Sequence, residues 1–241
     1  LANGASQWIT SPAAREDVQH WRARSSAILT GIGTVLADDP RLDVRLPSPA
    51  SGTPRPQPLR VVLDSRLQTP PGARMLATGG AVLIMTAANR GENGSGRAAR
   101  RAQLQASGAE IEDAAASAPE VLVSHPAPAV GARRAADANN RGTTSLSLPD
   151  VLERLGRREI NELWVEAGPR LAGALLHQTL VDELILYLAP KLLGPQARPL
   201  VEMGELHNLR EAPNFVIVET RQIGEDVRLR LQPASNTAPG G

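Results

Sequence analysis

The chain has 241 residues, of which 41% are apolar and only 2% aromatic, so we expect a core of aliphatic side chains. Its net charge of +1 argues against a general nucleic-acid or membrane-surface binder, and no apolar run approaches the ~20 residues of a membrane span. The absence of cysteine excludes disulfides and thiolate metal sites, and four scattered histidines predict no bound metal. No signal peptide is visible, so we expect a cytoplasmic protein.

The first part of the chain predicts a helix, a strand and a glycine-containing turn. A serine and a proline open the helix, which apolar residues at helical spacing extend over about residues 12–25. Ala27–Thr30 reads as a buried strand, and the Gly-Ile-Gly-Thr segment at 31–34 as a flexible turn. Residues 35–37 predict at most one helical turn before the Asp-Asp-Pro sequence at 38–40, which favours a turn.

The middle of the chain predicts more strands, one polar helix and a long loop. The helix is expected around Gly96–Ala106, and residues 126–144 are expected to be a mobile loop because they are rich in Ala, Pro, Asn and Arg. The predicted strands are Leu59–Leu63, Ala81–Met85 and, with weaker patterns, Ala109–Glu112 and Glu120–Ser124.

The segment ELWVEAGPRLAGALL, residues 162–176, predicts a strand, a tight turn and a helix. Its apolar run ends on Glu166, at the carboxyl end of a strand, where α/β folds bind ligands. Gly168 permits close approach of a ligand, and Pro169 suits the first turn of a helix. Such a helix start suits a phosphate, although an ordinary strand-to-helix turn would have the same pattern.

The C-terminal part predicts a helix, a strand and a hairpin. The helix is expected at Arg170–Leu180 and the strand at Leu184–Leu188, with the hairpin turn at 224–225 between residues 215–220 and 227–231. The order of elements predicts a three-layer α/β/α fold with a mixed, mostly parallel sheet that ends in an antiparallel C-terminal hairpin. We expect one domain over residues 1–233 and a disordered tail at 234–241.

Five motifs occur in one order along the chain: SQWITSP, ILTGIGTVLADDPRLDVR, LRVVLDS, LWVEAGPRLAGALL and VDELILYLAPKLLG. Together they resemble the C-terminal reductase domain of the bifunctional riboflavin-biosynthesis deaminase/reductase, over all but roughly residues 88–145 and the last ten. The resemblance implies a dihydrofolate-reductase-like fold and a homodimer. It also implies NADPH-dependent reduction of 5-amino-6-(5-phosphoribosylamino)uracil to 5-amino-6-(5-phosphoribitylamino)uracil.

The resemblance also implies site residues, position by position, although it identifies no catalytic group. The implied substrate contacts are Ser6, Arg22, Leu42, Arg45 and Glu166. The implied cofactor contacts are Trp8, Thr34, Asp38 and Ser65, with Gly168, Pro169, Arg170, Leu171, Ala172, Gly173 and Ala174 around the pyrophosphate. Arginine forks suit the substrate's 5′-phosphate, and we expect Ser65, with Arg66 as a further candidate, to meet the 2′-phosphate of NADPH.

The chain departs from the family pattern in three respects. It lacks the H-x-E and P-C-x-x-C signature of the N-terminal zinc deaminase, to which we expect it to be linked. The first strand of the fold is expected upstream of Leu1, and Ala167 stands where many relatives have glycine. Two alternatives therefore remain: a truncated, binding-only fragment, and a pterin or folate reductase on the same fold. For the arginines the alternative is solvated surface charge.

Overall fold

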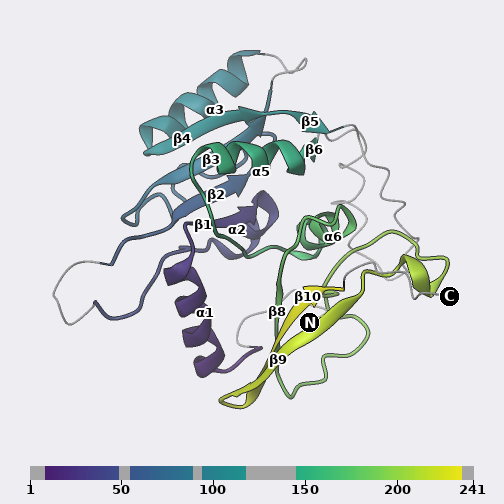
Figure 1. Ribbon diagram of the computed structural model, residues 1–241. Helices are drawn as coiled ribbons and strands as arrows, with labels where there is room; N and C mark the ends of the chain where they lie inside the picture. Colours follow the sequence, from purple (N-terminus) through teal and green to yellow (C-terminus); the bar gives the residue numbers. More distant parts are fainter. Residues whose placement is uncertain (1–8, 49–54, 89–93, 118–144, 235–241) are drawn as a thin grey trace. The chain divides into compact units, whose positions relative to one another are not determined.

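The computed structural model describes residues 9–48, 55–88, 94–117 and 145–234 (Figure 1). The chain divides into two compact units, Arg22–Gly168 and Leu1–Trp21 with Pro169–Gly241. The predicted loop at 126–144, the weak strand at 120–124 and most of the predicted tail lie outside the described residues. Among the helices that are described, none has the length and apolarity needed to cross a membrane.

The unit of residues 22–168 is built on a parallel sheet of five strands in the order β4-β3-β2-β1-β7. The strands are β1 (Ala27–Gly31), β2 (Leu59–Leu63), β3 (Val82–Ala87), β4 (Ala109–Ala114) and β7 (Leu163–Val165). Strand β1, which lies between β2 and β7, pairs through Ile28 with Arg60 of β2 and with Trp164 of β7. Parallel pairing leaves the carboxyl ends of all five strands at one edge, where ligands bind in such sheets.

One face of this sheet packs against two helices. These helices are α2 (Ile32–Asp38) and α3 (Gly94–Ala106). Val35 of α2 and Leu104 of α3 join Ile28, Val62 and Ile84 of the strands in one buried cluster. The aliphatic core expected from the composition is therefore centred on this face.

The opposite face carries the helix α5 (Leu148–Arg157), so this unit has three layers (Figure 1). Ile111 of β4 packs against the buried cluster, whereas its neighbours Glu110 and Glu112 point to the other face and accept hydrogen bonds from Arg158, just after α5. Ser147 caps α5 by accepting a hydrogen bond from the backbone N–H of Asp150. Two short antiparallel strands, β5 (Ala116–Ser117) and β6 (Ser145–Leu146), precede it.

The other unit contains an antiparallel sheet of three strands in the order β8-β10-β9. Its elements are most of α1 (Pro12–Arg24), α6 (Pro169–His177), β8 (Leu184–Leu188), the 3₁₀ turn η1 (Leu209–Glu211), β9 (Phe215–Ile223) and β10 (Asp226–Pro233). Gly224 has φ of 60°, which the tight turn between β9 and β10 requires. The predicted mixed α/β class with its C-terminal antiparallel hairpin is therefore confirmed, although hydrogen bonding divides the strands into separate sheets.

Residues 31–38 differ from their predicted structure. We predict a flexible turn and at most one helical turn, whereas the chain forms the seven-residue helix α2 directly after β1. Burial of Val35 in the core cluster stabilises this helix despite Gly33, since packing overrides local propensity. The helix ends at Asp39, whose φ of 41° is left-handed, just before Pro40.

Candidate functional site

Glu166 lies at the carboxyl end of β7 and is held there by the backbone of the neighbouring strand. Its N–H donates to the carbonyl of Leu29 at 2.9 Å, which continues the pairing of β7 with β1. Its own carbonyl accepts a hydrogen bond from the Thr30 hydroxyl at 2.7 Å. The carboxylate is thus fixed at the edge of the sheet where ligands bind, as predicted from its position after an apolar run.

Two side chains donate to the carboxylate of Glu166. Arg22 forms a bidentate pair with it, Nε to Oε1 and Nη2 to Oε2, both at 2.6 Å. Trp164, two residues earlier on the same strand, donates from Nε1 to Oε1 at 2.8 Å. The Arg22 side chain is only 10% exposed and that of Glu166 26%. Arg22 is therefore no solvated surface charge, and it orients a carboxylate that is still open to a ligand.

The third nitrogen of the Arg22 guanidinium connects this carboxylate to residues 41–45. Its Nη1 donates to the backbone carbonyl of Asp43 at 3.0 Å. The buried Asp43 carboxylate pairs with Nε of Arg41 at 2.9 Å and lies 3.8 Å from Nε of Arg45. Burial lowers the pKa of Arg60, and the negative charge of Asp43 opposes that shift. Asp43 thus interacts with several arginines at once.

Four of the five predicted substrate contacts therefore lie close together: Arg22, Leu42, Arg45 and Glu166. Ser6 lies outside the described residues. The Leu42 side chain is 1% exposed and belongs to the core cluster, so only its backbone can face a ligand. Its φ of 50° is left-handed, an uncommon conformation that functional sites often hold in place. The side chain of Arg45 is 57% exposed.

Trp164 and Asp43 are parts of this site that the sequence interpretation missed. Trp164 could have been found from spacing, because residues two apart on a strand share a face and Trp164 stands two positions before Glu166. Asp43 lies outside the strands, so no such periodicity points to it. Arg22 was identified only through the family resemblance, since it lies outside the five motifs.

Two of the predicted cofactor residues in the same unit, Thr34 and Gly168, lie next to each other at the turn after β7. A Cβ added to Gly168 would lie 3.8 Å from the hydroxyl oxygen of Thr34 on α2, an ordinary contact. Gly168 is not among the described glycines with positive φ. Neither strain nor crowding within the chain requires glycine there, so the space over Gly168 suits a bound group. Within the described residues, no hydrogen bond joins Asp38 or Ser65 to this pair, and Trp8 is not described.

The remaining predicted cofactor residues, 169–174, form the first six positions of α6. The free backbone N–H groups and positive dipole of this nine-residue helix suit a pyrophosphate. Gly173 has a different role, because a Cβ there would lie 1.8 Å from the carbonyl oxygen of Glu202. Glu202 also donates its N–H to the Pro169 carbonyl at 2.9 Å and pairs with Arg170 at 3.1 Å. The donors of the helix start therefore fit a dinucleotide, whereas Gly173 is required by packing.

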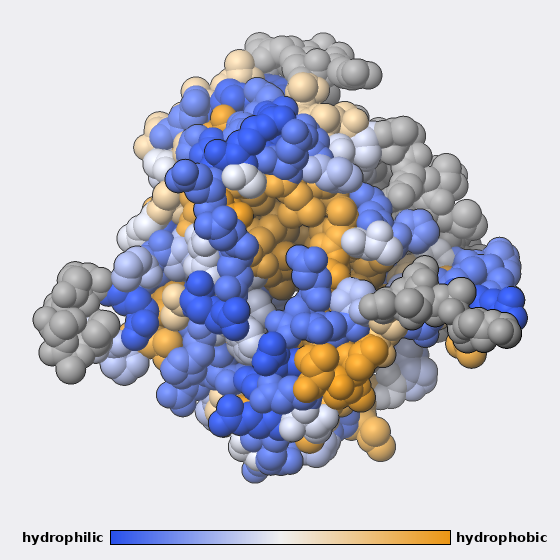
Figure 2. Space-filling model, in the orientation of Figure 1, coloured by the Kyte–Doolittle hydropathy of each residue, from blue (hydrophilic) through white to orange (hydrophobic). Residues whose placement is uncertain are grey.

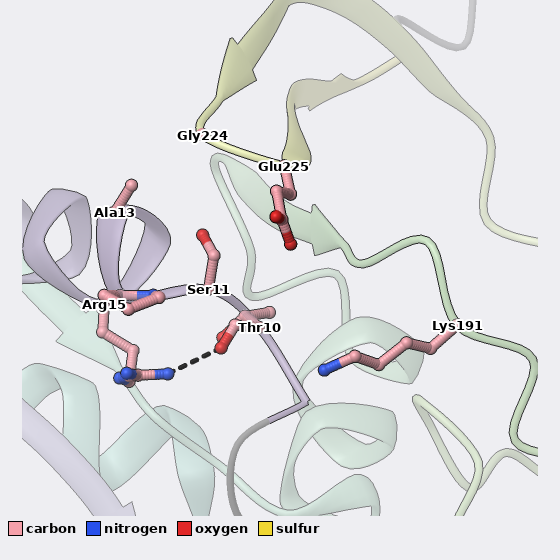
Figure 3. Close-up of a pocket in the computed structure, with 8 residues that line it drawn as sticks. Thr10, Ser11, Ala13, Arg15, Lys191, Gly224 and Glu225 are labelled. Atoms are coloured by element: carbon pink, nitrogen blue, oxygen red, sulfur yellow. Dashed lines mark hydrogen bonds between the residues drawn. The ribbon is translucent and has the colours of Figure 1, made fainter.

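An open pocket of about 530 Å³ lies within the unit that carries α6, near the start of α1 (Figure 3). In Figure 3 the Lys191 side chain reaches toward it, and Arg15 donates to the Thr10 carbonyl. The lining residues are Thr10, Ser11, Pro12, Ala13, Arg15, Lys191, Gly224 and Glu225. None of the predicted ligand contacts is among them, so we assign no ligand to this pocket.

Comparison with known proteins agrees with the motif resemblance. A family model described as the RibD C-terminal domain matches residues 1–229. The riboflavin biosynthesis protein RibD of Escherichia coli K12 is 39% identical over 238 residues, which cover 96% of this chain and 55% of the relative. A 5-amino-6-(5-phosphoribosylamino)uracil reductase of Buchnera aphidicola subsp. Acyrthosiphon pisum is 32% identical, with 97% and 99% covered.

The solved structure of Acinetobacter baumannii RibD, form 1, superposes with a TM-score of 0.72 at 31% identity, covering 98% of this chain and 54% of that one. The dihydrofolate-reductase-like fold predicted from the motifs is thereby confirmed. The chain spans about half the length of the Escherichia coli and Acinetobacter relatives. The family match extends over nearly all of the sequence, and the chain therefore belongs to the RibD C-terminal domain family.

Proposed function

We propose that the chain is a reductase that uses NADPH to convert 5-amino-6-(5-phosphoribosylamino)uracil to its ribitylamino product. The observation that carries this proposal is the cluster of Arg22, Arg45 and Glu166 at the carboxyl edge of the parallel sheet. The Buchnera relative named for this activity supports it, because the two chains cover one another almost completely. A single reductase domain over residues 1–233 remains part of the proposal.

The site's own residues would bind and orient the substrate. NADPH, when bound, supplies a hydride to the first carbon of the opened sugar. The Glu166 carboxylate, held by Arg22 and Trp164, keeps acceptor capacity for an N–H or O–H of the substrate. Hydride transfer depends on this positioning more than on acid–base groups. We assign no residue to the proton that moves when the sugar opens.

The geometry favours Arg45 over Arg22 for the 5′-phosphate of the substrate. Arg22 spends two nitrogens on Glu166 and one on the Asp43 carbonyl, whereas the Arg45 side chain is mostly exposed. We expect Arg45→Ala to weaken substrate binding by about ten- to a hundredfold and to leave NADPH binding unchanged. Arg41→Ala removes the other arginine beside Asp43 and is the matched control. If both variants lose substrate affinity equally, or if Arg45→Ala loses affinity for NADPH, Arg45 is not the residue that binds the 5′-phosphate.

The decisive experiment follows NADPH absorbance at 340 nm after the phosphoribosylamino substrate is added. A substrate-dependent fall supports the reductase. Binding of both ligands without any fall supports the binding-only alternative. A fall with dihydrofolate or a dihydropterin but not with the phosphorylated substrate supports the pterin or folate alternative. The exposed side chain of Arg45 favours the phosphorylated substrate over a folate, because an arginine fork suits a phosphate.

The proposal includes the homodimer that the resemblance implies. Figure 2 shows exposed hydrophobic surface on the antiparallel unit, and its edge strand β9 exposes three consecutive apolar residues, Val216, Ile217 and Val218. Such a patch on an edge strand favours association with another chain. Sedimentation velocity should show a dimer, and Ile217→Glu should shift it toward monomer. The linked zinc deaminase and the cytoplasmic location also remain proposals, to be tested on the whole protein in cell fractions.

A further inference from the structure

Arg97 of α3 is a buried arginine whose guanidinium reaches the carboxyl ends of two strands. The residue is 8% exposed. Its Nη1 donates to the carbonyl of Ser65, just after β2, at 3.2 Å. Its Nη2 donates to the Thr86 hydroxyl at 2.8 Å and to the carbonyl of Ala87, the last residue of β3. The positive charge therefore lies at the ligand-binding edge of the sheet, directly beside the predicted 2′-phosphate contact.

The hydrogen-bond acceptors of Arg97 among the described residues are all neutral oxygens, as are those of the buried Arg60, but Arg60 stands near the amino end of β2, away from this edge. The other two buried arginines have carboxylate partners. Arg22 pairs with the carboxylate of Glu166, and Arg228 pairs with that of Asp17. A buried guanidinium without a carboxylate leaves positive charge uncompensated, and this is costly unless an anion approaches. Three of its five N–H groups are used by these acceptors, so donors remain for such an anion.

The acidic residue nearest to this position cannot serve a ribose. Asp64, which precedes Ser65, is fully buried. Its Oδ2 accepts hydrogen bonds from the N–H and hydroxyl of Thr69, both at 2.7 Å, and its Oδ1 accepts one from the N–H of Arg66. A carboxylate that selects NAD must be open to the 2′-hydroxyl of the ribose. Asp64 is closed to it, so the described segment between β2 and β3 presents no open carboxylate for a ribose, whereas Arg97 places a cation there.

We infer that Arg97 is the residue that makes this site select a 2′-phosphorylated dinucleotide over its unphosphorylated form. The inference rests on the proposed function, because it places the adenosine end of the cofactor at the ends of β2 and β3. The positive charge that attracts the 2′-phosphate then comes mainly from Arg97, which is buried and lies more than thirty positions from Ser65 in the sequence. The adjacent Arg66 has a smaller part. Arg97 also fixes the Ser65 carbonyl, so it orients the predicted contact as well as attracting the phosphate.

The test compares two probes that differ only in the 2′-phosphate, adenosine 2′,5′-bisphosphate and adenosine 5′-monophosphate. Their dissociation constants are measured by calorimetry on the parent and on Arg97→Met. We expect the parent to prefer the bisphosphate, and the variant to lose roughly ten- to a hundredfold of that preference, as for a charge-assisted hydrogen bond. Binding of the monophosphate should change little. NADPH and NADH, followed by fluorescence, should show the same change in ratio.

Matched variants separate selection from folding. Arg97→Gln can still donate to the Ser65 carbonyl but carries no charge, so it should lose the preference even if Arg97→Met does not fold. Arg66→Met should keep most of it. If Arg66→Met removes the preference, or if both Arg97 variants bind the two probes in the parental ratio, the inference is overturned. A parent that binds neither probe nor NADPH would instead overturn the proposed function itself.

Discussion

Residues 22–168 and the unit formed by residues 1–21 with 169–241 differ in where their apolar side chains lie. Among the described residues, the buried apolar core belongs to the first unit apart from Ala14, Trp21, Leu175 and Leu176. The large exposed apolar side chains of the described residues lie mostly in the other unit, and only Leu36 among them belongs to residues 22–168. A parallel sheet covered on both faces buries its strands fully, whereas a three-stranded antiparallel sheet does not.

The antiparallel unit is organised around buried charge. Arg228 of β10 pairs with Asp17 of α1 at 2.7 Å and with Glu219 of β9 at 2.9 Å. The hydroxyl of Tyr187 also donates to Asp17, and the Arg228 guanidinium lies 5.4 Å from the centroid of the Trp21 ring. Directional contacts therefore replace aliphatic packing as the specific link between helix and sheet in this unit.

The largest expected effect comes from removing aliphatic volume in the parallel unit. Ile84→Ala in β3 should lower the free energy of unfolding by about 2–5 kcal/mol, because the side chain is 0% exposed and its loss leaves a cavity. The control change Leu209→Ala in η1, where the side chain is 87% exposed, should stay within about 0.5 kcal/mol. Urea unfolding of both variants gives the values. Similar losses would mean that the two units do not differ as described.

A smaller effect is expected from Asp17→Asn in the antiparallel unit. The change leaves the buried Arg228 without its closest carboxylate and should cost about 1–3 kcal/mol in urea unfolding. Glu153→Gln, which breaks the exposed pair of Glu153 with Arg157 on α5, is the control and should have little effect. A loss no larger than that of the control would refute the role given to Asp17.

The same pair predicts how stability depends on pH. Burial by itself raises the pKa of Asp17, but the hydrogen bonds from Tyr187 and Arg228 outweigh it, and the pKa lies below its usual value. A lowered carboxyl pKa stabilises the fold above the usual value of about 3.9 and loses that contribution as the pH falls through the folded pKa. The gap between parent and Asp17→Asn should therefore be widest near neutral pH and narrow in acid.

The smallest expected effect concerns a polar contact inside the aliphatic unit. Trp164→Phe keeps an aromatic side chain but removes the indole N–H that donates to Glu166, and should cost about 0.5–1.5 kcal/mol of stability. The Trp164 indole N–H resonance, assigned by its loss in this variant, should also move in Glu166→Gln. An unchanged resonance in Glu166→Gln would show that the indole does not donate to that carboxylate in solution.

The sequence predicted the elements of this fold well where local pattern and packing agree. Leu59–Leu63 and Leu184–Leu188 form strands with the predicted bounds, because aliphatic runs of that length suit buried or half-buried strands. The prediction for residues 31–38 was wrong because α2 depends on burying Val35, a contact that glycine content does not reveal. Local pattern gives the ends of elements and the turn chemistry, but not the packing that overrides it.

The candidate site could be predicted as a set of residues but not as an arrangement. The family resemblance placed Arg22, Arg45 and Glu166 in one site, and the structure links them through Asp43. It did not show that Arg22 would pair with Glu166, because a bidentate pair between distant residues leaves no local signal. In the same way, the resemblance placed Gly173 among the pyrophosphate contacts, whereas the structure explains this glycine by its close approach to the Glu202 backbone.

The Arg22–Glu166 pair joins residues 144 positions apart, and β7 pairs with β1 across almost the same span of chain. Strands β2, β3 and β4 each pair with the strand made immediately before them, whereas β7 pairs with β1 and must close a loop over the three strands made in between. Contacts between residues so far apart in the sequence form late, because the entropy cost of closing the loop opposes them until other contacts exist. We therefore expect a chain emerging from the ribosome to complete most of the parallel sheet before this site, so that ligand affinity appears only with the last strand.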